Sequence, residues 1–452
     1  MSRIKAWLAA PVDPASLAVF RISFGLLLIW DVFRYFLAGW IERYYLTPPF
    51  LFKYYGFEWV QPWPGDGLYW HFGVLGVLSV MITIGLYYRL AMIAFTAAFS
   101  YIYFLDQARY LNHFYLVIVI AMLMCLLPAG RAWSVDARLR DSWRGDASIP
   151  RWSVASMVLL FEVVLIYAGL VKVNPDWLAG QPLRLWFSDR AQWAVVGPFI
   201  AGDWAIYAAS WGSIVLHLIG APLLLWKRTR LAVFCVYACF HITNAIVFSI
   251  GIFPWLTIAG TLMFFSPDWP KQLWARLRRI PYQPVTLPAP AIGAPSTLLL
   301  IVLALFMAWQ ILMPLRHYLY PGNVAWTEEG HRFAWRMKLR TKRGHARYEV
   351  TDPETGRKWH IDPGDYLSRR QERYASTRPD MILQFAKELE RIWREEKGYA
   401  DVEVRARVWC ALNGRRPALL IDPSVDLTQI KRELWPPADW ILPMPQTKPG
   451  QK

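Results

Sequence analysis

The chain has 452 residues, of which 56% are apolar, 16% are aromatic and only 18% are charged. This composition argues against a set of soluble domains and favours a protein that is solvated largely by a membrane. The formal net charge is +16, but Lys and Arg are scattered over short loops and the C-terminal segment instead of forming one basic face, so we expect no nucleic-acid partner.

The first apolar run, at about 17–37, lacks a small-residue cleavage site and predicts a membrane helix that is retained in the protein. Several of the later runs approach the ~20 residues that cross a bilayer, so residues 1–313 are predicted to form a bundle of about nine transmembrane helices. The later runs fall near 69–87, 90–105, 114–129, 153–171, 204–226, 231–250, 252–265 and 296–313. The run at 252–265 is short, and it either spans the membrane or re-enters it.

Lys and Arg predict how the bundle is oriented, because positive charge is retained on the cytoplasmic side. With a cytoplasmic N-terminus, the inside segments carry far more Lys and Arg than the outside loops. Nine spans then place the C-terminus outside, whereas an even number of spans would invert the tail. We expect an integral protein of the cell inner membrane with an extracytoplasmic C-terminal domain.

Residues 314–452 differ from the bundle, since charges and prolines are frequent there. Short alternating stretches such as RYEV, RKWHI and EVRARVW predict strands, and residues 378–397 show helical spacing. A Pro-rich linker at 281–295 precedes the last apolar run. The sequence therefore predicts a mainly α polytopic membrane protein whose bundle is followed by an extracytoplasmic α+β domain.

Polar residues inside or beside apolar runs are the candidate site residues, because ionisable groups are costly in lipid and usually face a bundle interior. Asn112 and His113 begin the fourth span, Lys172 ends the fifth, and His241 and Asn244 share one face of the seventh. Lys172 is either an interfacial lysine that snorkels or a desolvated amine that accepts a proton near neutral pH. The two histidines alternatively make helix-to-helix hydrogen bonds.

The cysteines and histidines give no metal-binding pattern. Three of the four cysteines lie inside apolar runs and the fourth, Cys410, stands alone in the polar tail. Neither a disulfide framework nor metal-ligand spacing results, so we expect no metal.

Several motifs occur in one order along nearly the whole chain. In the bundle they are PVDPASLAVFRISFGLLL, LDQARYLNHFYL, WSVD, AGLVKVNPDW, FHITNAIVFSIGIF and FFSPDWPKQL, and in the tail AWRMKL, IDPGDYLSRR and LIDPSVDL. With this set the chain resembles vitamin K-dependent gamma-glutamyl carboxylase and its bacterial relatives that carry the horizontally transferred transmembrane domain.

The resemblance implies a carbon-carbon lyase activity with reduced vitamin K, a phylloquinol or menaquinol-like naphthohydroquinone, as cofactor and with O2 and CO2 as co-substrates. Oxygenation of the quinol to its epoxide would generate a base that removes the γ-proton of a peptidyl glutamate, and CO2 would then add to give gamma-carboxyglutamate. The implied partners are the lipid bilayer, the quinone and a glutamate-containing peptide or protein.

The resemblance also assigns roles to residues. Lys172 would deprotonate the hydroquinone, and the family's lysine pair is reduced here to Val171 and Lys172. His113 and Asn112 would stabilise oxyanionic intermediates by hydrogen bonds.

The remaining candidates belong to the cofactor and substrate sites. His241 and Asn244 are expected to bind the cofactor. Trp335 and Met337 match a segment near the glutamate site, while Arg369 and Arg370 are expected to pair with a substrate carboxylate. For these last four, the alternative is ordinary folding or surface charge.

Other functions remain open from the sequence. The chain is alternatively a quinol epoxidase that does not carboxylate, or a non-catalytic scaffold or lipid-binding membrane protein whose polar residues hold the bundle together. A transporter is disfavoured, because no paired broken helices occur in repeated halves.

Overall fold

The computed structural model describes residues 3–140, 148–194, 197–248, 250–284, 287–290 and 295–447. Within these residues, seven helices are long and apolar enough to cross a membrane. These helices are α2 (Ala15–Leu37), α3 (Gly67–Ile84), α4 (Tyr88–Leu105), α7 (Trp152–Leu170), α11 (Asp203–Val215) continued by η4 (Leu216–Gly220) and α12 (Ala221–Leu225), α13 (Arg230–Phe248), and α16 (Thr297–Leu312) continued by η6 (Met313–Leu319).

The other two apolar runs expected from the sequence form shorter helices. They are α5 (Asn112–Leu126) and α14 (Phe253–Thr261), which η5 (Leu262–Phe264) continues. A helix satisfies its own backbone hydrogen bonds, which lipid cannot do, so apolar runs of this length fold as helices. The expectation of a mainly α membrane protein is confirmed.

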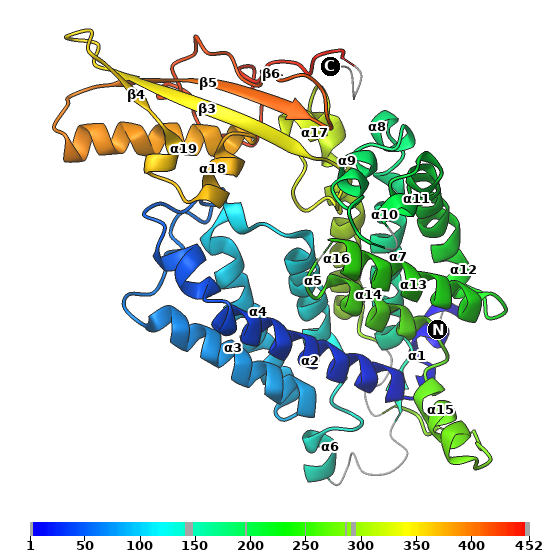
Figure 1. Cartoon of the computed structure of the whole chain (residues 1–452). Helices are drawn as coiled ribbons and strands as arrows, with labels where there is room; N and C mark the ends of the chain where they lie inside the picture. Colours follow the sequence, from blue (N-terminus) through cyan, green and yellow to red (C-terminus); the bar gives the residue numbers. More distant parts are fainter. Residues whose placement is uncertain are drawn as a thin grey trace.

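The helices form two groups that α14 connects (Figure 1). In the first group α2 packs against α3, α3 against α4 and α4 against α5. In the second, α7 contacts α11, α12, α14 and α16. α14 contacts α2 of the first group as well as α7 and α13, and in this way it connects the two groups.

Short elements lie at both ends of the bundle. The end away from the C-terminal domain carries α6 (Val135–Leu139) and α15 (Trp269–Arg278) (Figure 1). The remaining short elements are α1 (Arg3–Ala9), the paired strands β1 (Pro11–Val12) and β2 (Ile149–Pro150), η1 (Glu42–Leu46), η2 (Gln107–Arg109), α8 (Pro175–Leu178), α9 (Leu183–Ser188) and α10 (Gly197–Ile200).

Residues from 314 onward, here called the C-terminal domain, contain a four-stranded antiparallel sheet in the order β4-β3-β5-β6. Its strands are β3 (Lys342–Thr351), β4 (Lys358–Ile361), β5 (Glu403–Leu412) and β6 (Ala418–Leu419), and its helical segments are α17 (Val324–Thr327), η7 (Pro363–Asp365), α18 (Arg369–Ala375), α19 (Pro379–Arg391) and η8 (Ile392–Glu396). Alternate residues of β5 are buried, as expected for a strand with one covered face.

The expected elements of this domain are confirmed. The three alternating stretches form β3, β4 and β5, and the helix expected at 378–397 is α19 with η8. Of the Pro-rich linker expected at 281–295, residues 281–284 and 287–290 belong to no helix or strand, and residues 285–286 and 291–294 lie outside the described residues.

The C-terminal domain is docked on the bundle through shared cores. Phe52, from a loop of the bundle, and Ala108, from η2, belong to the hydrophobic core of the C-terminal domain. Conversely, Leu339 of the C-terminal domain packs in one cluster with Trp177 and Phe187 of the bundle. Because each part contributes side chains to the other's core, the interface positions residues of both parts against one another.

Candidate functional site

An apolar cavity of about 460 Å³ lies at the end of the bundle that faces the C-terminal domain. A volume of this size is typical of sites for small organic ligands. Four of the candidate residues line it, namely Lys172, His241, Asn244 and Met337. Most of its remaining wall is aliphatic or aromatic, including Leu165, Phe187, Leu216 and Phe253.

Lys172 enters this cavity from the segment that directly follows α7. Its side chain is buried, and its Nζ donates a hydrogen bond to the carbonyl oxygen of Ala168 in the last turn of the helix. The Nζ also lies 5.6 Å from the centre of the Trp177 ring. No carboxylate lies within ion-pair distance of this amine in the described part of the chain. Burial without an acidic partner lowers the pKa of Lys172 to about 7.

His241, on α13, is the most unusual polar group of the cavity. Only 1% of it is exposed, yet neither ring nitrogen has a hydrogen-bond partner among the described residues. Such unpaired buried groups cost free energy and require an explanation, of which a bound ligand is one. Asn244 lies one turn further along the same helix and lines the same cavity.

His217 lines this cavity too, although it is not among the candidate residues predicted from the sequence. Its Nδ1 lies 2.6 Å from the carbonyl oxygen of Ser213, one turn earlier, which leaves Nε2 as the free ring nitrogen. The rings of Tyr237 and Phe240 pack against it edge-on. The sequence could not predict that His217 lines the cavity, because the rings that pack against it come from another helix.

His113 lies outside the lining of the cavity, behind Phe253. The centre of the Phe253 ring is 5.8 Å from that of His241 and 6.5 Å from that of His113. Phe253, the first residue of α14, therefore stands between the two histidines. His113 thus lies on the side of the Phe253 ring that faces away from the cavity, and it does not contact Lys172.

Asn112 connects α5 to the C-terminal domain. Its side-chain nitrogen donates to the carbonyl oxygen of Arg336 at 3.2 Å, and its side-chain oxygen accepts from the hydroxyl of Tyr110 at 2.9 Å. Both polar atoms of Asn112 are thus engaged within the protein. In this arrangement the residue holds the segment that carries Met337.

That segment is the loop between α17 and β3. Four of its non-glycine residues, Glu328, Phe333, Trp335 and Lys338, have φ between 49° and 67°. Left-handed backbone of this kind is unfavourable for residues other than glycine and is maintained only when the surroundings impose it. Because of this irregular backbone, Met337 and Lys338 form part of the cavity wall. The C-terminal domain therefore completes a cavity whose other walls come from the bundle.

Trp335 takes a different position from its neighbour Met337. It is fully buried in the core of the bundle, with its ring centre 4.9 Å from that of Tyr115. Its indole Nε1 has no hydrogen-bond partner among the described residues. Trp335 thus fixes the loop against α5 and does not line the cavity.

Arg369 and Arg370 begin α18 and lie away from the cavity lining. Arg369 is exposed. Arg370 is partly buried, its Nε donates to the carbonyl oxygen of Ala108 at 3.4 Å, and its guanidinium lies 5.9 Å from the Tyr44 ring. The structure therefore places Arg370 at the contact between the C-terminal domain and the bundle.

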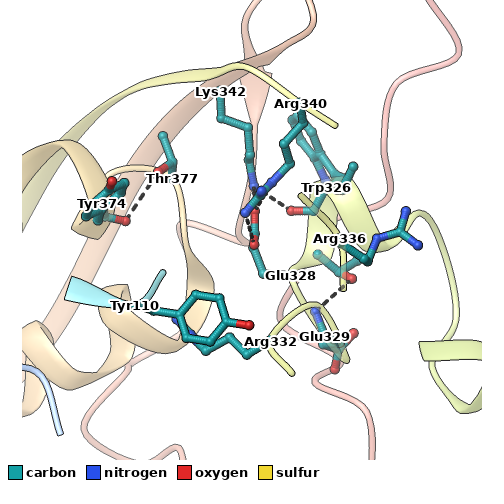
Figure 2. Close-up of polar contacts among 12 residues, drawn as sticks. Tyr110, Trp326, Glu328, Glu329, Arg332, Arg336, Arg340, Lys342, Tyr374 and Thr377 are labelled. Carbon is teal, nitrogen blue, oxygen red and sulfur yellow. Dashed lines mark hydrogen bonds and ion pairs between the residues drawn. The ribbon is translucent and has the colours of Figure 1, made fainter. Parts of the chain in front are cut away.

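A buried cluster of charged residues lies next to the loop (Figure 2). Arg340 and Lys342 converge on the carboxylate of Glu328, with Arg340 Nε 2.8 Å and Lys342 Nζ 3.3 Å from Oε1. Burial alone would raise the pKa of Glu328, but these two cations outweigh it and hold the pKa well below its usual range. Arg332 pairs with Asp380 at 2.7 Å.

Two further cations of this region, Arg336 and Arg378, interact with Glu328 only at longer range and form no ion pair in the described part of the chain. The guanidinium of Arg336 points away from Glu328 in Figure 2, and burial lowers the pKa of Arg336 to about 10. The guanidinium of Arg378 lies 3.9 Å from the centre of the Tyr374 ring. The cluster around the loop therefore carries more positive than negative charge.

Comparison with known families assigns both parts of the chain. Residues 9–269 match the model of the HTTM domain. Residues 295–447 match the model described as the vitamin K-dependent gamma-carboxylase, lumenal domain. The chain is a gamma-carboxylase-like protein of the HTTM family. No solved structure matches it.

The candidate residues of this gamma-carboxylase-like protein fall in both matched regions. Asn112, His113, Lys172, His241 and Asn244 belong to the HTTM match. The candidates Trp335, Met337, Arg369 and Arg370 belong to the second match. The cavity is therefore built jointly by the two family domains.

Metal ligands do not gather in this gamma-carboxylase-like protein as far as its described residues extend. No group of three or more His, Cys, Asp or Glu side chains is arranged there to hold a metal ion. The polar groups of the cavity lining include two amines, two imidazoles and an amide, from Lys172, Lys338, His217, His241 and Asn244, besides hydroxyl and thiol groups.

Proposed function

We propose that this protein is a vitamin K-dependent gamma-glutamyl carboxylase. The observation that carries the proposal is the buried amine of Lys172, which shares an apolar cavity with the unpartnered imidazole of His241. When reduced vitamin K is bound, its oxygenation by O2 to the epoxide supplies a base strong enough to remove a glutamyl γ-proton, and CO2 adds to the resulting carbanion.

Lys172 supplies the proton acceptor for the quinol hydroxyl in this proposal. A phenolic hydroxyl and an ordinary ammonium both titrate near pH ~10, so an exposed lysine would be protonated at neutral pH. With its pKa lowered to about 7 by burial, a substantial fraction of Lys172 is neutral and able to take a proton. The apolar walls favour this form because they exclude water.

His241 and Asn244 are proposed to orient the quinol in the cavity. The free ring nitrogens of His241 are suited to a hydroxyl or carbonyl oxygen of the naphthoquinol, which would relieve their lack of partners. His113 and Asn112, the proposed stabilisers of oxyanions, lie across Phe253 and at the 335–337 loop. Neither residue lines the cavity of Lys172, so both are proposed to act on oxygens that lie away from the amine.

The charged cluster is proposed to receive the glutamyl carboxylate. Arg336 and Arg378 are cations that form no ion pair in the described chain, and a planar guanidinium binds a carboxylate through two parallel hydrogen bonds. Arg336 is next to Met337, which lines the cavity. A glutamate held by Arg336 would therefore lie close to the place where the base forms. Arg369 and Arg370 are proposed to contribute further along the substrate.

The proposed arrangement divides the chain into a transmembrane bundle at 1–313 and a second domain at 314–452. We propose that the protein resides in the cell inner membrane with the second domain outside the cytoplasm. The description of the matched family domain as lumenal supports that side.

The deciding experiment measures epoxide and fixed carbon in one reaction. The full-length protein would be incubated with reduced phylloquinone, O2, a glutamyl peptide and labelled bicarbonate. We expect both vitamin K epoxide and labelled peptide. Epoxide without labelled peptide would reduce the function to quinol epoxidation, and the absence of both would leave a scaffold or lipid-binding protein.

The matched variants separate chemistry from folding. Lys172→Met removes the amine but keeps the length and the apolar stem of the side chain, so the variant should fold. Its rate of epoxide formation should be at least ~100-fold lower. Lys271→Met serves as the control, because Lys271 lies on α15 at the far end of the bundle, where it is partly exposed and pairs with Asp13. Unchanged epoxide formation in folded Lys172→Met would refute the proposed role.

A further inference from the structure

A buried ion pair joins the C-terminal domain to the turn that follows Lys172. The two terminal nitrogens of Arg415, in the turn between β5 and β6, donate to the carboxylate of Asp176 at 2.7 and 2.5 Å. The side-chain nitrogen of Asn413 donates to the same carboxylate at 2.8 Å. The side chains of Arg415 and Asp176 are only 8% and 12% exposed. A two-pronged pair of this kind fixes orientation as well as distance.

Asp176, the bundle residue of this ion pair, is connected to Lys172 by a series of hydrogen bonds. Asp176 belongs to α8, which begins directly after Asn174. The side chain of Asn174 accepts from the backbone nitrogen of Trp177 at 3.1 Å and donates to the carbonyl oxygen of Val171 at 3.0 Å. The backbone nitrogen of Asn174 donates to the carbonyl oxygen of Lys172 at 2.8 Å. A displacement of Asp176 is therefore transmitted to the backbone of Lys172.

Trp177 extends this connection to the amine itself. Its indole nitrogen donates to the carbonyl oxygen of Ser210 at 3.1 Å, which anchors the ring on α11. The ring lines the cavity, and its centre is 5.6 Å from Lys172 Nζ. The ring that covers the amine thus belongs to the residue next to Asp176.

The other end of the contact is equally well fixed. Asn413 has a φ of 52°, and it exchanges two hydrogen bonds with Thr341, at 2.8 and 2.9 Å. Arg415 Nε donates to the carbonyl oxygen of Thr447 at 2.9 Å. Because Thr341 ends the loop that carries Met337, the turn at 413–415 holds two walls of the cavity at once.

We propose that Arg415, acting through Asp176, is a positioning residue that keeps the amine of Lys172 inside the cavity and away from water. The base is then complete only when the C-terminal domain is docked on the bundle. The catalytic consequence rests on the proposed function, but the position of the amine is measurable without turnover.

A second ion pair between the same two parts provides the matched control. Arg432 of the C-terminal domain pairs with Glu58 of the bundle at 3.1 Å. Glu58 is more than half exposed, and neither residue lines the cavity of Lys172. Removal of this pair therefore tests loss of an interdomain contact without disturbance of residues 171–177.

The experiment measures how the reactivity of the Lys172 amine depends on pH. Full-length protein would be treated with a small amine-directed reagent, and modification of Lys172 would be quantified by mass spectrometry. We expect Arg415→Met and Asp176→Asn to raise the pH at which modification of Lys172 is half-maximal. The increase should be at least about one pH unit, toward the ~10.4 of an exposed lysine. Arg415→Lys should restore part of the shift, and Glu58→Gln should leave the midpoint unchanged.

An unchanged midpoint in folded Asp176→Asn would overturn the inference, as would an equal shift in Glu58→Gln. Asp176→Asn nearly preserves the shape of the side chain, so it decides the matter if Arg415→Met does not fold. Epoxide assays on the same preparations keep the two proposals apart. A wild-type protein that forms no epoxide but shows the labelling shift retains the inference and loses the proposed function.

If epoxide does form, its pH profile adds a second readout. A misplaced amine should move the acidic limb of the Arg415→Met profile upward by the same amount as the labelling midpoint. A merely structural loss would instead lower the rate by one factor at every pH, and that outcome would also contradict the inference.

Discussion

Lys172 and Met337 line the same cavity, although Lys172 follows a membrane helix and Met337 belongs to the C-terminal domain. The contact between the two domains is therefore part of the site. The hydrogen bond from Asn112 to the carbonyl oxygen of Arg336 and the ion pair of Arg415 with Asp176 secure this closure from two sides.

The first prediction concerns the pH dependence of epoxide formation. In the proposed function the neutral amine of Lys172 is the active form, and burial lowers its pKa to about 7. The rate should rise with pH and level off about one unit above that value. At pH ~6 it should be roughly tenfold below the plateau, because only about a tenth of the amine is then neutral. A rate that rises only above pH ~9 would contradict a buried base.

Stability should respond to the same group. Since the pKa of Lys172 is lower in the folded protein than in the unfolded one, the folded state binds fewer protons between pH 7 and the ordinary lysine value of 10.5. Stability should therefore rise with pH across that window. Lys172→Met should remove this dependence and should raise the melting temperature most clearly at pH 7 and below. Thermal unfolding of both proteins at several pH values measures the effect.

A third prediction concerns the unpartnered ring of His241. His241→Leu removes a buried polar group without a hydrogen bond, so it should leave stability unchanged or raise it by ~1 kcal/mol. If His241 orients the quinol, the same variant should lower epoxide formation at least ~10-fold. His217→Leu is the control for stability, since it loses a bond to Ser213 and should be destabilised by ~1 kcal/mol. Full epoxide output in His241→Leu would remove the residue from the site.

A fourth prediction concerns the buried carboxylate of Glu328. Glu328→Gln leaves Arg340 and Lys342 buried without their counter-charge, so unfolding free energy should fall by ~3–5 kcal/mol. Because the pKa of Glu328 is held well below its usual range, this stabilisation is present above pH ~4.5 and is lost as the pH falls below it. Glu349→Gln breaks a largely exposed pair with Lys358 and should cost at most ~1 kcal/mol. Equal losses in both variants would contradict the assignment.

The last prediction separates carboxylation from epoxidation. If Arg336 binds the glutamyl carboxylate, Arg336→Gln should raise the peptide concentration for half-maximal carbon fixation by roughly tenfold, equivalent to ~1.4 kcal/mol. Arg343→Gln changes an exposed arginine on β3 and should have no such effect. Peptide titrations with labelled bicarbonate provide the measurement, and identical curves for the two variants would exclude this role.

Much of the architecture follows from the sequence, because a bilayer imposes simple rules on an apolar chain. Runs of the required length must become helices, and alternating stretches in the polar tail must become strands with one buried face. That Lys172, His241 and Asn244 face the interior of the bundle could be predicted for the same reason, since polar groups within apolar runs are costly in lipid.

Which of these groups meet was decided only by the tertiary structure. Phe253 separates His113 from His241, and His217 joins the cavity, because the packing of α14 and η4 sets those neighbours. The pair of Arg415 with Asp176 spans 239 positions of the chain. Sequence periodicity reports which face of an element is buried, but it carries no information on which distant element covers that face.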